Sequence, residues 1–186
     1  RDRRPIEDGA DIVLHSATKY LAGHNDVLAG VVVTDSADLY EKLFYNLNTT
    51  GAVLSPFDSY QLIRGLKTLS LRMERSTANA QEIVAFLKQS PAVKEVLYTG
   101  RGGMISFKVA DEKRIPHILN TLKVFSFAES LGGVESLITY PTTQTHADIP
   151  AEVRHSYGLT DDLLRLSIGI EDARDLIADL SQALEG

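Results

Sequence analysis

Cysteine is absent from this chain of 186 residues. Without thiols, the chain can form no disulfide, hold no cysteine zinc site and use no thiolate nucleophile. The five histidines are scattered and show no metal-ligand spacing such as HExxH. We therefore predict no metal, and any demanding chemistry must come from an organic cofactor.

Long hydrophobic runs and an excess of positive charge are absent as well. No stretch approaches the roughly 20 apolar residues of a membrane span, and residues 1–5 lack the apolar stretch of a secretory signal. The 25 acidic and 19 basic residues give a formal net charge of −6, which argues against a nucleic-acid partner bound by charge. We expect a packed cytoplasmic protein, with no membrane and no nucleic acid as partner.

The first part of the chain has the pattern of an α/β fold. Short, apolar, β-rich runs at 11–15 and 27–34 fit buried strands, and a polar loop separates them. The serine, the acidic start and the apolar spacing over 36–46 predict a capped helix. Helical spacing continues over 57–90, with a break between two helices expected at Gly65.

The rest of the chain has the pattern of an α+β fold, with a boundary near residue 68. Alternating apolar residues over 93–98 and 104–109, joined by a glycine-rich turn, predict an antiparallel hairpin. The remaining predicted elements are a helix over 111–122, short apolar runs near 125 and 137, a strand over 163–168 and a helix over 172–184.

Chemistry-bearing side chains are most concentrated in the loop after the first predicted strand. There the sequence His-Ser-Ala-Thr-Lys-Tyr places the hydroxyls of Ser16 and Thr18 just before Lys19. Ligands bind at strand ends in α/β sheets, hydroxyls beside backbone amides suit a phosphate, and an amine can condense with an aldehyde. Pyridoxal phosphate (PLP) needs all of these groups. The bare Ser-x-Thr-Lys pattern is weak, since most such lysines in proteins are solvated surface residues.

Three well-separated segments, 9–30, 127–138 and 164–172, match motifs of one family. Together they resemble the Cys/Met-metabolism PLP enzymes, which include cystathionine γ-synthase, γ-lyase and β-lyase. The resemblance covers essentially the whole chain. It implies the end of the large PLP-binding domain of a fold-type I (aspartate aminotransferase-like) enzyme over 1–68. A small C-terminal α+β substrate-binding domain, with a mainly antiparallel sheet covered by helices, would follow over 69–186.

The resemblance also implies roles for the residues of the lysine loop. Lys19 would hold PLP as a Schiff base and would shuttle protons at the substrate. The hydroxyls of Ser16 and Thr18 would hold the cofactor phosphate. Such a lysine acts as a base only when its pKa is lowered, and Schiff-base formation together with burial achieves this.

Substrate-binding residues are implied in the second half of the chain. An arginine fork is the best partner for an amino acid's α-carboxylate, and by resemblance Arg165 takes this role. Ser130, in the run Ser-Leu-Gly-Gly, would help to position the substrate, and Thr145 would support the arginine from behind. Without the resemblance, Arg165 would be interpreted as a surface residue of an edge strand.

The implied reaction is PLP-dependent γ-replacement, in which an O-acylated homoserine is joined to cysteine to give cystathionine. The alternatives are a β- or γ-lyase that breaks a carbon-sulfur bond of cystathionine, and an isolated domain without catalytic activity. Glu129 resembles the γ-synthase and γ-lyase branches more than classical β-lyases, in which an aromatic residue is usual at this position. The leaving group and the acyl group stay open.

The resemblance corresponds only to about the second half of a family member, and the chain has no initiator methionine. In the family the first half supplies the aspartate at the pyridine nitrogen and further phosphate ligands. We therefore expect the chain to need a missing N-terminal half as partner and to be inactive alone. Family members are usually tetramers with shared active sites, which implies self-association between copies of the intact protein.

Overall fold

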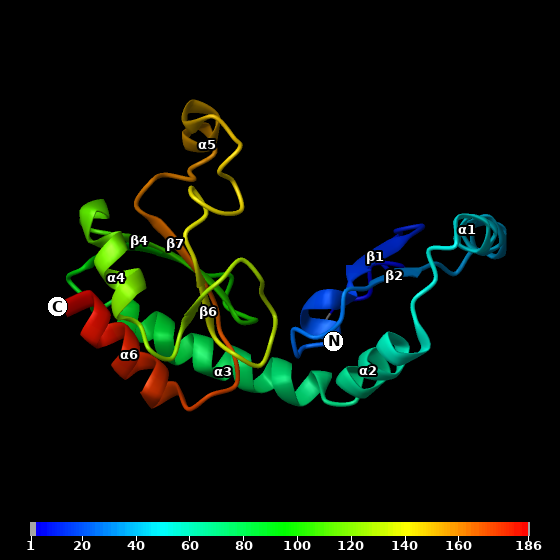
Figure 1. Ribbon diagram of the computed structural model, residues 1–186, viewed down its shortest axis with the longest axis horizontal. Helices are drawn as coiled ribbons and strands as arrows, with labels where there is room; N and C mark the ends of the chain where they lie inside the picture. The colour runs from blue at the N-terminus through cyan, green and yellow to red at the C-terminus, as the bar shows by residue number, and fades with distance from the viewer. Residues whose placement is uncertain (1–2, 186) are drawn as a thin grey trace. The chain divides into compact units, whose positions relative to one another are not determined.

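The computed structural model describes residues 3–185 (Figure 1). Its contacts divide the chain after Lys67 into two compact units, 1–67 and 68–186, here called unit 1 and unit 2. Among the described residues, no helix is both long enough and apolar enough to cross a membrane.

Unit 1 contains a two-stranded antiparallel pair and two helices. Strand β1 (Val13–Ser16) pairs with β2 (Gly30–Val33), so that Ser16 lies opposite Gly30. Helix α1 (Ala37–Thr50) is capped by the Ser36 side chain, which accepts from the Leu39 amide, as the sequence predicted. Helix α2 (Pro56–Leu66) begins with a proline, whose missing N–H costs nothing in the first turn.

The predicted loop 16–26 contains a helical turn that the sequence did not indicate. Ala17–Leu21 form a short π-helical turn, η1, which follows β1 directly. Backbone hydrogen bonds hold this turn, since the Thr18 amide donates to the Ala29 carbonyl and the Gly23 amide, just after the turn, donates to the Lys19 carbonyl. The turn fixes the direction in which the chain leaves the strand.

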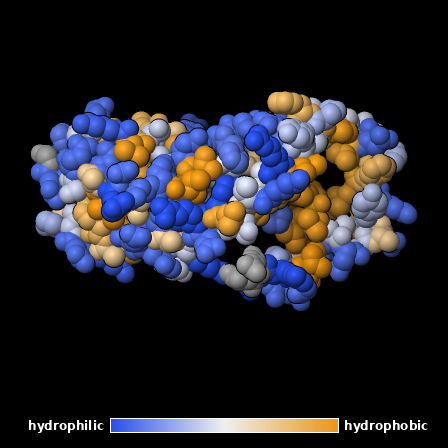
Figure 2. Space-filling model, turned by 90° about the horizontal axis from the view of Figure 1, so that it is seen from below, coloured by the Kyte–Doolittle hydropathy of each residue, from blue (hydrophilic) through white to orange (hydrophobic). Residues whose placement is uncertain are grey.

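The prediction that both strands of unit 1 are buried is wrong for this chain. Leu14 is 74% exposed and Val32 is 48% exposed. Among the described residues of the unit, the buried core is a small cluster formed by Ala17, Ala22, Val27 and Leu62. An apolar run favours burial, but a covering layer has to come from elsewhere, and the described residues of unit 1 provide none over this pair. Figure 2 shows hydrophobic side chains gathered on the surface of this unit, in the right-hand part of the view.

Unit 2 is built on a five-stranded sheet of order β3-β4-β7-β6-β5. Four of the strands pair antiparallel, and only β5 and β6 pair in parallel. The strands are β3 (Val93–Leu97), β4 (Met104–Val109), β5 (Ser126–Phe127), β6 (Leu137–Thr139) and β7 (Leu163–Ser167). The hairpin predicted over 93–98 and 104–109 is confirmed as β3 and β4.

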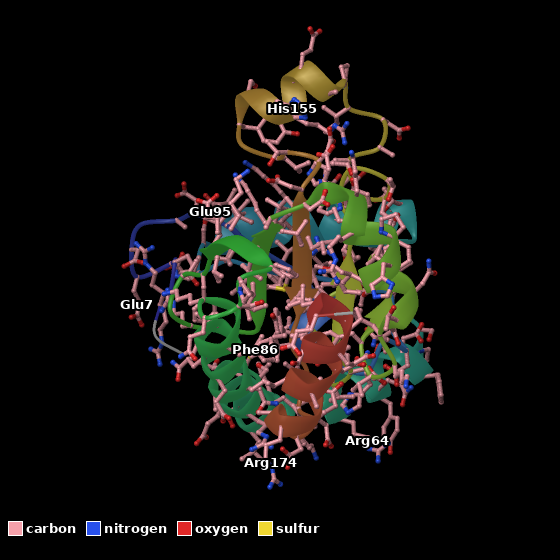
Figure 3. The ribbon with its side chains drawn as sticks, turned by 90° about the vertical axis from the view of Figure 1, so that its left-hand side faces the viewer. Glu7, Arg64, Phe86, Glu95, His155 and Arg174 are labelled. Atoms are coloured by element: carbon pink, nitrogen blue, oxygen red, sulfur yellow. The ribbon has the colours of Figure 1, made fainter. Side chains whose placement is uncertain are left out.

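Three helices pack on one face of this sheet. They are α3 (Leu69–Leu87), α4 (Ile115–Thr121), which follows the short turn η2 (Glu112–Arg114), and α6 (Ala173–Glu185). The buried side chains of β4 alternate, with Ile105 and Phe107 fully covered and their neighbours partly exposed, because successive side chains point to opposite faces. The core lies between this face and the helices, where Phe86 of α3 packs against it (Figure 3).

One further helix was missed by the sequence prediction. Between β6 and β7 the chain makes a long excursion that contains α5 (Ala151–Ser156), which carries His155 (Figure 3). None of the residues of α5 is buried, so the helix leaves no strong apolar periodicity in the sequence. Arg154 of this helix donates to the Thr142 carbonyl, which joins α5 to the start of the segment between β6 and β7.

Candidate functional site

The lysine loop of unit 1 begins where β1 ends. Ser16 is the last residue of the strand, and Lys19 lies inside the turn η1 with non-helical backbone angles, φ −90° and ψ −126°. The kink turns the half-buried Lys19 away from the regular path of the helix. The structure therefore brings the predicted cofactor residues Ser16, Thr18 and Lys19 together in one short segment at a strand end.

The Thr18 hydroxyl has backbone partners of its own. Its Oγ1 accepts from the Ala29 amide at 2.9 Å and lies 3.3 Å from the Ala29 carbonyl. These contacts pin the loop to the residue that precedes β2. The hydroxyl hydrogen is therefore donated to a backbone carbonyl in this structure.

Gly65 of α2 fixes the position of the lysine loop from the other side. A Cβ atom at Gly65 would lie 2.2 Å from the carbonyl oxygen and 2.9 Å from the carbonyl carbon of Ala22. Only glycine lets α2 approach the loop this closely. The helix ends one residue later, at Leu66, so the predicted break lies close to Gly65, but the reason for the glycine is packing.

The second group of predicted residues lies in unit 2, and one of them, Arg165, lies on the sheet face opposite the helices. Arg165 of β7 alternates with the fully buried Leu164 and Leu166 and therefore points away from the helix layer. Its Nη2 donates to the Glu129 carbonyl at 2.9 Å, to the Thr139 hydroxyl at 3.0 Å and to the Ser130 carbonyl at 3.4 Å.

Ser130 and Thr145 differ in how they relate to Arg165. Ser130 contacts it through its carbonyl oxygen, whereas the hydroxyl of Thr145 is 2.7 Å from Nδ1 of its neighbour His146. The hydroxyl that receives a hydrogen bond from Arg165 is that of Thr139, which the sequence analysis missed. Thr139 lies opposite Arg165 in the β6–β7 register, and only strand pairing brings the two residues together.

Comparison with known proteins connects these two groups of residues to one family. The model of the Cys/Met metabolism PLP-dependent enzymes matches residues 2–185. This chain belongs to that family. The resemblance stated from the motifs is thereby confirmed, as is PLP as the cofactor of the family.

The similar proteins are enzymes of sulfur amino-acid metabolism. Cystathionine gamma-synthase/O-acetylhomoserine (thiol)-lyase of Bacillus subtilis is 58% identical over 98% of this chain and 49% of that protein. Cystathionine gamma-synthase of Haemophilus influenzae is 56% identical over 97% of this chain and 49% of its own length. The chain thus spans about half the length of the curated relatives it matches.

Solved structures agree with this relationship. Cystathionine gamma synthase from Xanthomonas oryzae pv. oryzae in complex with cystathionine matches with a TM-score of 0.93 and 42% identity, over 98% of this chain and 52% of that one. The cystathionine gamma-lyase CalE6 from Micromonospora echinospora matches with a TM-score of 0.96 and 38% identity, over 99% and 53%. A mixed α and β architecture belonging to PLP-dependent enzymes is therefore shown for this chain.

The groups around Lys19 fit that cofactor chemically. The amine of Lys19 can condense with an aldehyde, and Ser16 and Thr18 carry hydroxyls in the same short segment at the strand end. The Thr18 hydroxyl donates to the Ala29 carbonyl, and it would exchange this acceptor for a phosphate oxygen if it bound the cofactor. A planar cation on the sheet face of unit 2 complements a carboxylate.

Proposed function

We propose that this chain contributes the lysine and the carboxylate-binding arginine of a PLP-dependent trans-sulfuration enzyme. The reaction would be γ-replacement, in which the Cγ–O bond of an O-acylated homoserine breaks and the acyloxy group leaves as a carboxylate. The sulfur of cysteine, having lost its thiol proton, would bond to Cγ in its place, giving cystathionine. The observation that carries the proposal is the fixed guanidinium of Arg165, held by two loop carbonyls and the Thr139 hydroxyl. It is the fork that an amino-acid substrate requires.

Each residue group would have its own part in this reaction. PLP, when bound, withdraws electrons from the bonds at the substrate's α-carbon. Lys19 would hold the cofactor and then carry the proton that leaves the α-carbon, while Ser16 and Thr18 would bind the phosphate. Arg165 would fix the α-carboxylate, and Ser130 would help to orient the substrate.

Similarity favours γ-replacement over carbon-sulfur cleavage. The two γ-synthase relatives are 58% and 56% identical to the chain, against 51% for cystathionine gamma-lyase of Bacillus subtilis and 49% for a cystathionine beta-lyase of Lactococcus lactis. The γ-synthase comparison runs over 182 positions, whereas the γ-lyase comparison needs 199 positions for the same 98% of the chain. The chain therefore aligns with the γ-synthase relative with fewer gaps.

Lyase activity is the second candidate, and it is favoured by one observation. Structures of two cystathionine gamma-lyases superpose on this chain with TM-scores of 0.91 and 0.96. The same lysine and arginine would serve a lyase, with the carbon-sulfur bond of cystathionine breaking instead of the bond between Cγ and the acyloxy oxygen. The backbone of this chain would therefore suit either reaction.

The active enzyme would need residues beyond this sequence. The chain spans about half of its relatives, and we propose that the other half of the cofactor pocket comes from residues outside it and that copies of the whole protein associate. On this proposal the chain alone turns over little or no substrate. We assign residues 1–68 to the PLP-binding domain and residues 69–186 to a substrate-binding domain.

A cofactor titration tests the role of the lysine. The purified chain is titrated with PLP, followed by absorbance, reduced with borohydride, digested and mapped. Specific modification of Lys19 supports the proposal, with Lys19→Ala as control, while modification spread over surface lysines contradicts a preformed site. For the whole enzyme, release of cystathionine from O-acylhomoserine and cysteine supports γ-replacement, and cleavage of cystathionine alone supports the lyase.

A further inference from the structure

We propose that Ser136 and Glu171 act as a positioning pair that holds Arg165 and the residue 128–136 loop in the geometry needed to bind a substrate α-carboxylate. This inference rests on the function proposed above and extends it to residues that do not touch the substrate. The loop 128–136 is here called the serine loop, because it carries Ser130.

The pair is a two-point contact between a carboxylate and one buried residue. Ser136 is fully buried. Its amide donates to Oε1 of Glu171 at 2.6 Å, and its hydroxyl donates to Oε2 at 2.9 Å. Both carboxylate oxygens of Glu171 thus accept hydrogen bonds from the same residue, Ser136. Hydrogen bonds to a charged acceptor are stronger than those between neutral groups. The end of the serine loop is held in one orientation.

The Ser136 hydroxyl also forms a hydrogen bond with the backbone of the segment that follows β7. Its Oγ accepts from the Gly169 amide at 2.9 Å. A Cβ at Gly169 would lie 2.1 Å from the Val134 carbonyl oxygen and 2.5 Å from Oε2 of Glu171. The two segments therefore approach at a distance that only glycine permits, and this closeness lets one hydroxyl bond to both Glu171 and Gly169.

Two more hydrogen bonds join the serine loop to the last residue of β7 and to the segment that follows it. The Gly132 amide donates to the Ser167 hydroxyl at 2.8 Å, and the Ile170 amide donates to the Val134 carbonyl at 2.9 Å. Gly132 has a φ of +77°, which favours glycine. A loop with so little side-chain bulk packs weakly by itself, so its shape depends on these tethers.

The segment after β7 is in turn fixed to helix α3. The Asn79 side chain, which is completely buried, donates to the Gly169 carbonyl at 3.2 Å and to the Glu171 carbonyl at 2.8 Å. Arg75 donates to the same Glu171 carbonyl at 3.2 Å. Glu171 therefore has a rigid backbone, which it needs if its carboxylate is to set the position of something else.

The Ser136–Glu171 pair is connected to the proposed carboxylate site both through β7 and through the serine loop. Arg165 lies on β7, directly before the segment that carries Glu171, and its guanidinium donates to the Glu129 and Ser130 carbonyls of the serine loop. Releasing Ser136 would loosen those carbonyls, and the guanidinium would keep the Thr139 hydroxyl but lose the two loop partners that help to orient it. A displacement of about 1 Å at a positioning group can cost on the order of 100-fold in a reaction rate.

The test compares ligands that differ only in the carboxylate. In the PLP-loaded whole enzyme, inhibition constants are measured for L-norvaline and for butylamine, the amine that lacks only its carboxylate. We expect the preference for norvaline to fall by about 10- to 100-fold in Ser136→Ala and Glu171→Ala. Glu171→Gln, whose amide oxygen still accepts from the Ser136 amide, should recover most of it.

A matched control separates positioning from folding. Asp179 is a buried carboxylate of unit 2, and it accepts from the amides of Lys123, Val124 and Phe125. Asp179→Ala should lower thermal stability while the norvaline preference of the folded enzyme stays as in the wild type. Ser136→Ala removes one oxygen atom and adds no atoms that could clash. If Glu171→Ala does not fold, Ser136→Ala alone therefore still tests the inference.

The outcomes distinguish this inference from the proposed function. If the wild-type enzyme does not prefer norvaline, the carboxylate site itself is wrong and the pair falls with it. If the wild type prefers norvaline and Ser136→Ala keeps that preference within about twofold, the function stands and the positioning pair is refuted. An equal loss of preference in Asp179→Ala would likewise refute it, because any damage to unit 2 would then have the same effect.

Discussion

Replacing Gly65 by alanine tests the closest contact in unit 1. The new Cβ would lie 2.2 Å from the Ala22 carbonyl oxygen, so the helix and the lysine loop would have to separate by about 1 Å to restore normal contact. Overpacking of this kind costs typically about 1–3 kcal/mol, and we take about 3 because the clash is with backbone. Alanine returns up to about 1 kcal/mol through helix propensity. The free energy of unfolding should therefore fall by about 2 kcal/mol.

Urea unfolding followed by far-UV circular dichroism measures this change. Gly30 supplies the matched control, since a Cβ there would meet only the His15 carbonyl at 4.0 Å, and Gly30→Ala should stay within about 0.5 kcal/mol of the wild type. Gly51 has open space but a φ of +71°, so Gly51→Ala should cost about 1 kcal/mol through backbone strain alone.

PLP labelling tests whether the contact between Gly65 and Ala22 affects Lys19. Because the separation displaces the loop that carries Lys19, PLP labelling of Lys19 should decline in Gly65→Ala and stay unchanged in Gly30→Ala. If Gly65→Ala is as stable as Gly30→Ala, α2 does not pack on Ala22 as described and the reasoning is refuted.

Three further changes test other parts of the molecule. Arg165→Lys should raise the KM of the whole enzyme for its amino-acid substrate about tenfold or more, measured by steady-state kinetics, because a lysine cannot donate two parallel bonds. Asp179→Ala should lower the free energy of unfolding by about 2–4 kcal/mol in urea, because it leaves backbone amides unpaired. Burial by itself would raise the pKa of Asp162, but the hydrogen bonds from Lys94 and Thr160 outweigh it and lower that pKa. The ionised carboxylate therefore stabilises the fold above pH ~4, and this stabilisation is lost as the pH falls through the lowered pKa. Melting temperatures measured across pH should therefore fall less on acidification in Lys94→Met than in the wild type.

The elements of the chain follow largely from local patterns. The alternation in β3 and β4, the Ser36 cap of α1 and the spacing of the last helix all stand close to their predicted positions, because side-chain periodicity is set by the chain itself. α5 was missed for the same reason, since an exposed helix has no buried face to mark it.

The sequence by itself also determined the family, since the motifs that carry the resemblance need no fold to be recognised. The Ser-x-Thr-Lys loop and Arg165, to which the proposed chemistry is assigned, stand in those motifs. Tertiary structure alone decided which groups meet. Thr139 contacts Arg165 through strand register, Glu171 contacts Ser136 through the close approach at Gly169, and β1 and β2 remain exposed despite their apolar residues. Local patterns encode preferences for burial and secondary structure, whereas partners and covering layers depend on segments far apart in the chain, whose positions only packing specifies.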